Sequence, residues 1–210
     1  MDGAAQPRKR ALLIDYAGVL TSSVKVSFSS FCVSRQLPPS RLIEVFGTPA
    51  GAQLLGAIER GEIDDSQFER ELAPLLGPLV NPEGTLDALA GGLEQSSGLV
   101  ASIGRLRGEG VKTLLVSNSF GRSWYRAVDI ESTFDAAILS GQLGIRKPSR
   151  AIYQAALETG GVTADEAIFI DDLEINLEGA RRVGIAGYLH TDEDSTIRLL
   201  TEVFGVPASR

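Results

Sequence analysis

Short apolar runs, each ending at polar residues, mark the chain at regular intervals. The clearest of them cover residues 11–14, 113–116 and 167–170. Such continuous apolar runs are typical of strands buried on both faces, as in a parallel sheet. Two further short strands are predicted at 136–139 and 187–190.

Helical patterns lie between these runs, and glycine closes each of them. They cover residues 97–109, 149–158 and 173–183. Glycine is a common helix stop because it adopts positive φ without strain. This alternation of strands and helices predicts an α/β fold with a Rossmann-like, doubly wound parallel sheet.

The segment 22–95 departs from the alternation. Turn signals such as Gly47-Thr48-Pro49 and Gly77-Pro78 separate helical stretches, and no convincing strand is present. We therefore predict a core of residues 8–21 plus 96–206, with a small helical cap of residues 22–95 inserted after the first strand. A cap placed there covers the carboxyl ends of the strands and excludes water.

Composition agrees with one globular domain of a cytoplasmic protein. Of the 210 residues, 43% are hydrophobic and 22% are charged, and no apolar run approaches the roughly 20 residues of a membrane-spanning helix. The net charge of −7 argues against a nucleic-acid partner, because such proteins carry a basic face. The single cysteine, Cys32, is expected to be buried, and the basic residues 1–10 to form a short disordered tail.

Carboxylates follow two of the predicted strands. Asp15 ends the first, and Asp171-Asp172 end the strand at 167–170. Because ligands of open parallel sheets lie outside the carboxyl ends of the strands, these groups are expected to meet. Adjacent acids repel each other unless a cation neutralises them, and oxygen ligands suit Mg²⁺. Gly18 permits a tight turn beside such a site.

Neutral donors and one lysine complete the candidate chemistry. Ser117 and Asn118 end the second strand, where they serve equally well as a helix N-cap. Lys147 lies between a glycine turn and Pro148, which can start the next helix, so it is a candidate for a fixed charge facing phosphate. A nucleophilic carboxylate, a divalent metal, polar donors and a lysine suit phosphoryl transfer.

Four motifs in this order resemble those of the haloacid dehalogenase superfamily of hydrolases. They are DYAGVLT at Asp15, LLVSNS at Ser117, GIRKP at Lys147 and FIDDLEINLEGA at Asp171-Asp172. Within the superfamily the chain is similar to small-cap phosphatases that include bacterial α-D-glucose-1-phosphate phosphatase and the phosphatase domain of soluble epoxide hydrolase. The stretches ERGEIDDSQFEREL, LSGQLGIRKPSRAIYQAAL and FIDDLEINLEGARRVGI carry this similarity.

The resemblance implies a magnesium-dependent phosphatase that acts on a small phosphorylated metabolite. Asp15 would attack phosphorus and bind Mg²⁺. The backbone carbonyl of Ala17 and the carboxylate of Asp172 would be further ligands, with Asp171 in support.

The resemblance also assigns the phosphoryl group to the remaining motif residues. Ser117 and Asn118 would hold it, and Lys147 would offset its charge and that of Asp15. Asn176 would fix the geometry of the loop after the acids.

Position 17 departs from the family pattern. Most phosphatases of the superfamily have a second aspartate there, which protonates the leaving group, whereas Ala17 cannot transfer a proton. Loss of a positioned acid typically costs about 10²–10⁴ in rate. We therefore expect a leaving group that needs little protonation, such as an anomeric sugar phosphate or an acyl phosphate, or a proton from another source.

Three alternatives remain at this stage. A catalytically degenerate relative would bind a phosphorylated ligand or a partner without turnover. A phosphonatase-type hydrolase shares the alanine but needs a Schiff-base lysine in the cap, where Lys25, near its start, is the one lysine of 22–95. A dehalogenase also lacks the second aspartate, but the resemblance implies that it would not keep the paired acids Asp171-Asp172.

Several other residues have ordinary structural explanations. His190 is expected to be structural or solvent-facing, and Trp124 and Tyr125 line a pocket or pack between core and cap. The charged cap residues at 59–65 are expected to be mostly solvated, with one of them able to reach the leaving group.

Overall fold

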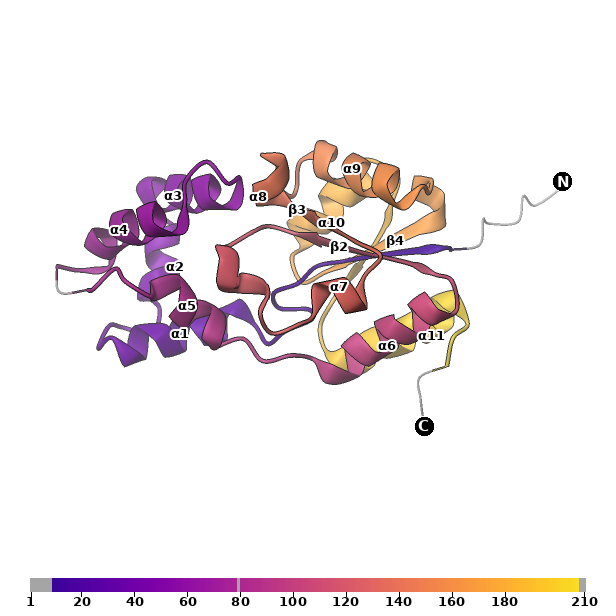
Figure 1. Cartoon of the computed structure of the whole chain (residues 1–210), viewed down its shortest axis with the longest axis horizontal. Helices are drawn as coiled ribbons and strands as arrows, with labels where there is room; N and C mark the ends of the chain where they lie inside the picture. The colour runs from indigo at the N-terminus through magenta and orange to yellow at the C-terminus, as the bar shows by residue number, and fades with distance from the viewer. Residues whose placement is uncertain (1–8, 79, 208–210) are drawn as a thin grey trace, which may run out of the picture.

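Among residues 9–78 and 80–207, which the computed structural model describes, the central feature is a sheet of five parallel strands (Figure 1). They lie in the order β3-β2-β1-β4-β5. Their bounds are β1 (Ala11–Ile14), β2 (Lys112–Ser117), β3 (Ala136–Leu139), β4 (Ala167–Asp171) and β5 (Ala186–Leu189). All five predicted strands are confirmed, with ends that differ by at most one residue. Ser117 and Asp171 are the last strand residues because they pair with Leu139 and Leu189.

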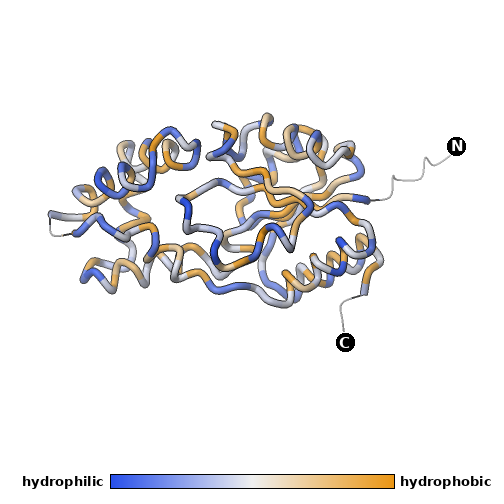
Figure 2. Tube along the Cα trace, viewed as in Figure 1, coloured by the Kyte–Doolittle hydropathy of each residue, from blue (hydrophilic) through white to orange (hydrophobic). Residues whose placement is uncertain are grey.

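Strand β1 is apolar throughout because helices cover both faces of the sheet. All four of its residues are fully buried. Leu12 and Ile14 belong to one hydrophobic cluster, whereas Leu13 belongs to a second cluster on the other face. Successive side chains of a strand point to opposite faces, so each cluster receives every second residue. Figure 2 shows the central strands as largely apolar, whereas polar and apolar residues alternate along the surrounding helices.

The helices of the core form a layer on each side of the sheet. Residues of α9 and α10 pack on one face, and residues of α6 and α11 pack on the other (Figure 1). This confirms the doubly wound α/β fold. The bounds are α6 (Ser97–Gly108), η1 (Arg122–Tyr125), α7 (Ile130–Thr133), α8 (Ser140–Leu143), α9 (Arg150–Gly160), η2 (Ala164–Glu166), α10 (Glu174–Arg181) and α11 (Glu193–Phe204).

The helix predicted at 149–158 is confirmed as α9. Ser149 is its N-cap, the Ser149 side chain accepts from the Ala151 backbone N–H, and the helix begins at Arg150, so Pro148 precedes the helix rather than starting it. Ser117 and Asn118 are not helix N-caps, since Gly121 is the N-cap of η1.

Five helices between β1 and α6 gather at the end of the molecule away from the described termini (Figure 1). They are α1 (Val24–Ser34), α2 (Arg41–Phe46), α3 (Pro49–Glu59), α4 (Asp65–Leu76) and α5 (Thr85–Gly91). Side-chain oxygens of Ser23, Thr48 and Asp64 cap the first turns of α1, α3 and α4. The chain enters and leaves this helical region at adjacent points, because Thr21 and Gln95 form an antiparallel bridge. The exact division at 22–95 stays a prediction.

Two expectations concern the chain as a whole. No described helix is both long and apolar enough to span a lipid bilayer. The tail predicted at residues 1–10 lies outside the described residues except for Lys9 and Arg10.

Candidate active site

The polar residues predicted to converge do meet at the carboxyl ends of three neighbouring strands. Asp15 follows β1 directly, Ser117 ends β2 and Asp171 ends β4. Since β1 lies between β2 and β4, the three side chains share one edge of the sheet. Lys147 joins them from the loop before α9, and its Nζ lies 2.7 Å from both Asp15 Oδ1 and Asp171 Oδ2.

Lys147 is held in place by its backbone as well as by its charge. Its N–H donates to Asn118 Oδ1 at 2.9 Å, and its carbonyl accepts from Asn118 Nδ2 at 3.4 Å. The side chain is almost fully buried. Burial favours the neutral amine, but Asp15 and Asp171 outweigh it and raise the pKa of Lys147 above its ordinary value. The ammonium is therefore fixed and charged.

Asp171 and Asp172 are adjacent in sequence but differ in their surroundings. Asp171 is fully buried, and its Oδ1 accepts from Leu173 N–H and Asn176 Nδ2, both at 2.9 Å. Its other oxygen holds Lys147, so Asp171 is fully engaged. Asp172 lines the cavity, and its carboxylate accepts no hydrogen bond from any other residue of the described part.

The carboxylates outnumber the cation. Ligand oxygens of Asp15, Asp171 and Asp172 lie within 4.8 Å of one another, and Lys147 neutralises one charge. Burial raises the pKa of Asp15 to about 7, although Lys147 opposes the shift. Burial and then Asp171 also raise the pKa of Asp172. The excess of buried negative charge is the condition that a divalent cation relieves.

The free oxygens face the open space. Asp15 Oδ1 accepts from Tyr16 N–H and Lys147, whereas Oδ2 has no protein partner within residues 9–78 and 80–207. Gly18 has a φ of +87°, and a Cβ built on it would lie 2.6 Å from Asp172 Oδ2. Only glycine therefore permits this approach of backbone to carboxylate. An all-oxygen set of this kind fits Mg²⁺.

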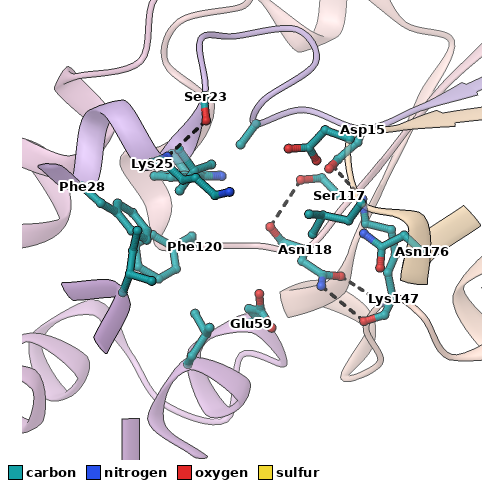
Figure 3. A pocket seen from close by; sticks show the side chains of 17 residues that line it. Asp15, Ser23, Lys25, Phe28, Glu59, Ser117, Asn118, Phe120, Lys147 and Asn176 are labelled. Atoms are coloured by element: carbon teal, nitrogen blue, oxygen red, sulfur yellow. Dashed lines mark hydrogen bonds and ion pairs between the residues drawn. The ribbon is translucent and has the colours of Figure 1, made fainter. Parts of the chain in front are cut away.

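A cavity of about 280 Å³ opens in front of these groups (Figure 3). Asp15, Ala17, Ser117, Lys147 and Asp172 line its core side. The Ser117 hydroxyl donates to the Asn118 carbonyl at 3.3 Å. Ala17 presents no side-chain donor to the cavity. Asn118 also lines it, but its amide holds the Lys147 backbone, so binding of phosphate by this side chain stays a prediction.

The opposite side of the cavity comes from the helices before α6 and from the loop after β2. It includes the side chains of Val24, Lys25, Phe28, Ile43, Leu55, Glu59, Phe120 and Trp124. Glu59 forms an ion pair with Arg146, the neighbour of Lys147, and thereby joins α3 to the core. Burial raises the pKa of Glu59, although Arg146 opposes this. Of the charged residues at 59–65, Glu59 is thus the one that lines the cavity.

A family model described as haloacid dehalogenase-like hydrolase matches residues 9–184. The chain belongs to this family.

Relatives of the haloacid dehalogenase-like chain include two curated proteins at 26% identity. One is acyl-CoA dehydrogenase family member 10 of Mus musculus, of which the match covers 94% of this chain but 19% of that protein. The other is the sesquiterpene phosphatase astK of Aspergillus oryzae, with 76% of this chain and 83% of the relative covered.

The fold has a counterpart among solved structures of the family. A HAD family enzyme from Bacteroides thetaiotaomicron superposes with a TM-score of 0.73 at 24% identity, covering 88% of this chain and 95% of the other. That enzyme was also crystallised with magnesium and inorganic phosphate.

Sequence reasoning missed most of the apolar wall of the cavity in this hydrolase. Phe28, Ile43, Leu55 and Phe120 carry no motif, and their spacing equals that of ordinary core positions. For Trp124, a pocket wall and packing between core and cap were both open, and the structure places it in the cavity lining. Tyr125 instead packs edge-on against Tyr16, with ring centroids 4.9 Å apart.

His190 and Cys32 have structural positions, whereas Lys25 contributes to the cavity. His190 Nδ1 lies 2.8 Å from Thr196 Oγ1, and Cys32 is buried as expected. Lys25 lines the cavity despite its place near the start of the cap.

Proposed function

We propose that the protein is a Mg²⁺-dependent phosphatase that transfers the phosphoryl group of a small phosphorylated metabolite to Asp15. The observation that carries this proposal is the asymmetry of Asp15. Lys147 and the Tyr16 N–H hold Oδ1, while Oδ2 remains without a described protein partner beside the cavity. The word phosphatase in the name of one relative, and the magnesium and phosphate of the Bacteroides enzyme, agree with it.

Asp15 and Asp172, with the backbone carbonyl of Ala17, would hold the metal. Bound Mg²⁺ would supply positive charge that screens the nucleophile from the phosphate it attacks. Asp171 would position Lys147 through Oδ2 and support the metal directly or through water. Oδ2 of Asp15 would form a bond to phosphorus as the bond to the leaving oxygen breaks, and water would then release phosphate from the aspartyl-phosphate.

Lys147 and Ser117 would receive the charge of the transferring group. Lys147 Nζ is fixed beside Asp15 at 2.7 Å, so no reorganisation is needed when negative charge develops. Ser117 is almost fully buried at the cavity floor, where its hydroxyl would donate to a phosphoryl oxygen. Asn118 would support this arrangement through the Lys147 backbone.

The leaving group departs without help from residue 17, since Ala17 has no ionisable group. The proposal therefore favours esters whose leaving oxygen is acidic enough to leave as an anion. Glu59 and Lys25 are the titratable cap side chains that line the cavity.

Phosphate release from sugar, acyl, nucleotide and aryl phosphates with Mg²⁺ tests the proposal. We expect turnover by the wild type, none after chelation of the metal, and a loss of at least about 10⁴ in Asp15→Asn. Absence of turnover in the wild type, with activity appearing in Ala17→Asp, would instead establish a degenerate binding protein. Activity unchanged in Asp15→Asn would exclude the covalent route.

A second candidate is a phosphonatase-type hydrolase, and the position of Lys25 favours it. Its side chain lines the cavity, and no carboxylate of the described ranges forms an ion pair with it. In that chemistry the amine condenses with a substrate aldehyde and releases water. Borohydride reduction with a phosphonoaldehyde would then leave a stable adduct on Lys25, absent in Lys25→Arg. Failure to trap an adduct together with ester turnover selects the phosphatase.

A further inference from the structure

The side of the cavity opposite Asp15 is mostly apolar. Apart from Ser23, Lys25 and Glu59, the side opposite Asp15 is lined by apolar side chains, namely Val24, Phe28, Ile43, Leu55, Phe120 and Trp124. Glu59 already has Arg146 as its ionic partner. Figure 3 shows Phe28 and Phe120 on the far side of the opening from Asp15 and Ser117.

This wall is preformed. The Phe120 ring packs against Phe28 at 5.9 Å, Phe68 at 5.3 Å and Trp124 at 4.9 Å between ring centroids. All four rings are buried or nearly so. These rings are closely packed and apolar, so this part of the wall offers a substrate apolar contact area and few hydrogen-bond partners.

A polyhydroxylated leaving group does not suit this wall. Each buried hydroxyl without a partner costs about 1–3 kcal/mol, whereas each buried methylene contributes about 0.8 kcal/mol. The volume of about 280 Å³ lies just below the roughly 300–1,000 Å³ common for ligand pockets. The site therefore favours a compact apolar group over a sugar.

Ala17 adds an independent requirement. Without a proton donor at this position, a leaving oxygen that is stable as an anion has the advantage. A phenol has a pKa of about 10, as in tyrosine, while an alcohol is nearly as weak an acid as water. A phenolate is therefore a far better unassisted leaving group than an alkoxide.

We propose that the preferred substrates are compact aryl phosphate monoesters, with the aromatic ring against Phe28, Phe120 and Trp124. This assignment rests on the proposed phosphatase function. Asp15 Oδ2 forms the new bond to phosphorus, the bond from phosphorus to the phenolic oxygen breaks, and the electron pair leaves with the phenolate.

Three esters separate the two requirements. Phenyl phosphate has both properties, cyclohexyl phosphate is apolar with a poor leaving group, and glucose 1-phosphate is polar. We expect cyclohexyl phosphate to retain a KM close to that of phenyl phosphate but to lose kcat by at least about 10². Glucose 1-phosphate is expected to show a KM at least about tenfold higher. Equal or better kcat/KM for glucose 1-phosphate would overturn the proposal while leaving a phosphatase.

Variants of the wall test the ring position. Ile43 is 45% exposed and Leu55 is partly buried, so glutamine is tolerated at both without loss of the fold. Ile43→Gln and Leu55→Gln are expected to raise the KM of phenyl phosphate by roughly tenfold. Val33→Gln is the matched control, because Val33 is 59% exposed and lies outside the cavity lining. An unchanged KM in both wall variants contradicts the assignment.

Binding without turnover supplies a separate readout. The chain has one tryptophan, and Trp124 lines the cavity, so intrinsic fluorescence reports on occupancy. With Mg²⁺ present, phenylphosphonate is expected to change the fluorescence at a concentration at least tenfold lower than hydroxymethylphosphonate. This preference without hydrolysis of any ester would refute the phosphatase and support the aromatic pocket. No preference, with hydrolysis intact, would refute the aromatic pocket alone.

Discussion

The two walls of one cavity differ in what holds them together. The core wall consists of charged and polar groups at strand ends, where Lys147 lies 2.7 Å from two buried carboxylates. The opposite wall consists mainly of apolar side chains from α1, α2 and α3 and the loop after β2. Removing one partner of a buried ion pair leaves the other charge unpaired in a medium of low dielectric constant, which strongly destabilises the fold. Apolar side chains can be replaced by others of similar volume at a smaller cost. We therefore expect the proposed reaction to depend on fixed residues of the core, and substrate selectivity to change with substitutions in the opposite wall.

Removal of Lys147 is expected to have the largest effect on this contrast. Lys147→Met leaves Asp15 and Asp171 without their shared cation, and breaking a buried pair costs about 3–5 kcal/mol. Urea unfolding in metal-free buffer measures the free energy of unfolding. Lys112→Met is the control, because Lys112 is exposed at the other end of β2, and surface substitutions change stability by about 0.5 kcal/mol or less. Equal stability of the two variants would contradict the electrostatic account.

Asp171→Asn in the Lys147→Met background sharpens that result. The double variant removes one of the two orphaned carboxylates, so we expect it to regain part of the lost stability. No recovery would mean that Lys147 stabilises the fold through contacts other than these ion pairs, such as that of Nζ with the Phe169 ring, whose centroid lies 5.4 Å away.

Magnesium is expected to stabilise the core wall, by about 2.7 kcal/mol at a hundredfold excess over the dissociation constant. Because burial raises the pKa of Asp15 from 3.8 to about 7, the metal-free folded state retains a proton that the unfolded chain has released. Its stability therefore falls as pH rises from about 4 to 7, and magnesium affinity rises over the same range. Thermal unfolding at several pH values with and without Mg²⁺ measures both trends.

The control for this pH dependence is Asp15→Asn, which removes the titrating group. Without metal, we expect the stability of this variant to lack the decline with rising pH that is assigned to Asp15. We also expect the variant to bind Mg²⁺ weakly. A wild type whose magnesium affinity is constant between pH 5 and 8 would show that Asp15 is ionised throughout.

Ala17→Asp returns a proton donor to the core wall. For cyclohexyl phosphate we expect an increase in kcat of roughly 10², whereas phenyl phosphate is expected to change little because its leaving group needs no proton. Steady-state kinetics on the two esters measures the ratio of the two changes in kcat. An equal gain on both would show that proton donation limits aryl esters too. Ala17→Asn is the uncharged control.

The smallest effect is expected at Arg146, the sequence neighbour of Lys147. Its ion pair with Glu59 is partly exposed, with 38% of the Arg146 side chain accessible, and such pairs contribute up to about 1 kcal/mol. Urea unfolding of Arg146→Met should therefore show a loss far below that of Lys147→Met. Arg60→Met is the control, since its partner Glu62 belongs to the cap itself. A loss in Arg146→Met equal to that of Lys147→Met would contradict this difference.

The sequence located the core wall because each of its parts has a local signal. Apolar runs predict the strands, and Asp15 is distinguished from an ordinary helix cap by Gly18 and by the second acid pair, Asp171-Asp172, after another strand. The parallel arrangement then brings the strand ends together. The cap wall has no such signal, because Phe28 or Leu55 facing a cavity occupies the same helical spacing as a residue facing the core.

Lys25 and Asn118 have contacts that the sequence does not predict. Lys25 lies near the start of the cap, which argued against a Schiff-base role, yet α1 places it at the cavity. Asn118 is predicted to hold the phosphoryl group, and in the structure its amide also spans the backbone of Lys147, 29 residues further along. Neither contact follows from spacing, since both depend on how a loop and a helix dock.

By itself, the sequence determined the fold class, the family and the cluster of acids, because strand patterns and strand-end residues are local properties. Only the tertiary structure decided how Asp171 and Asp172 divide their tasks. Successive residues of an extended chain point in opposite directions, and the docking of the Lys147 loop selects which of the two receives the ammonium. The same docking leaves Asp172 and Oδ2 of Asp15 facing a cavity whose other wall is apolar.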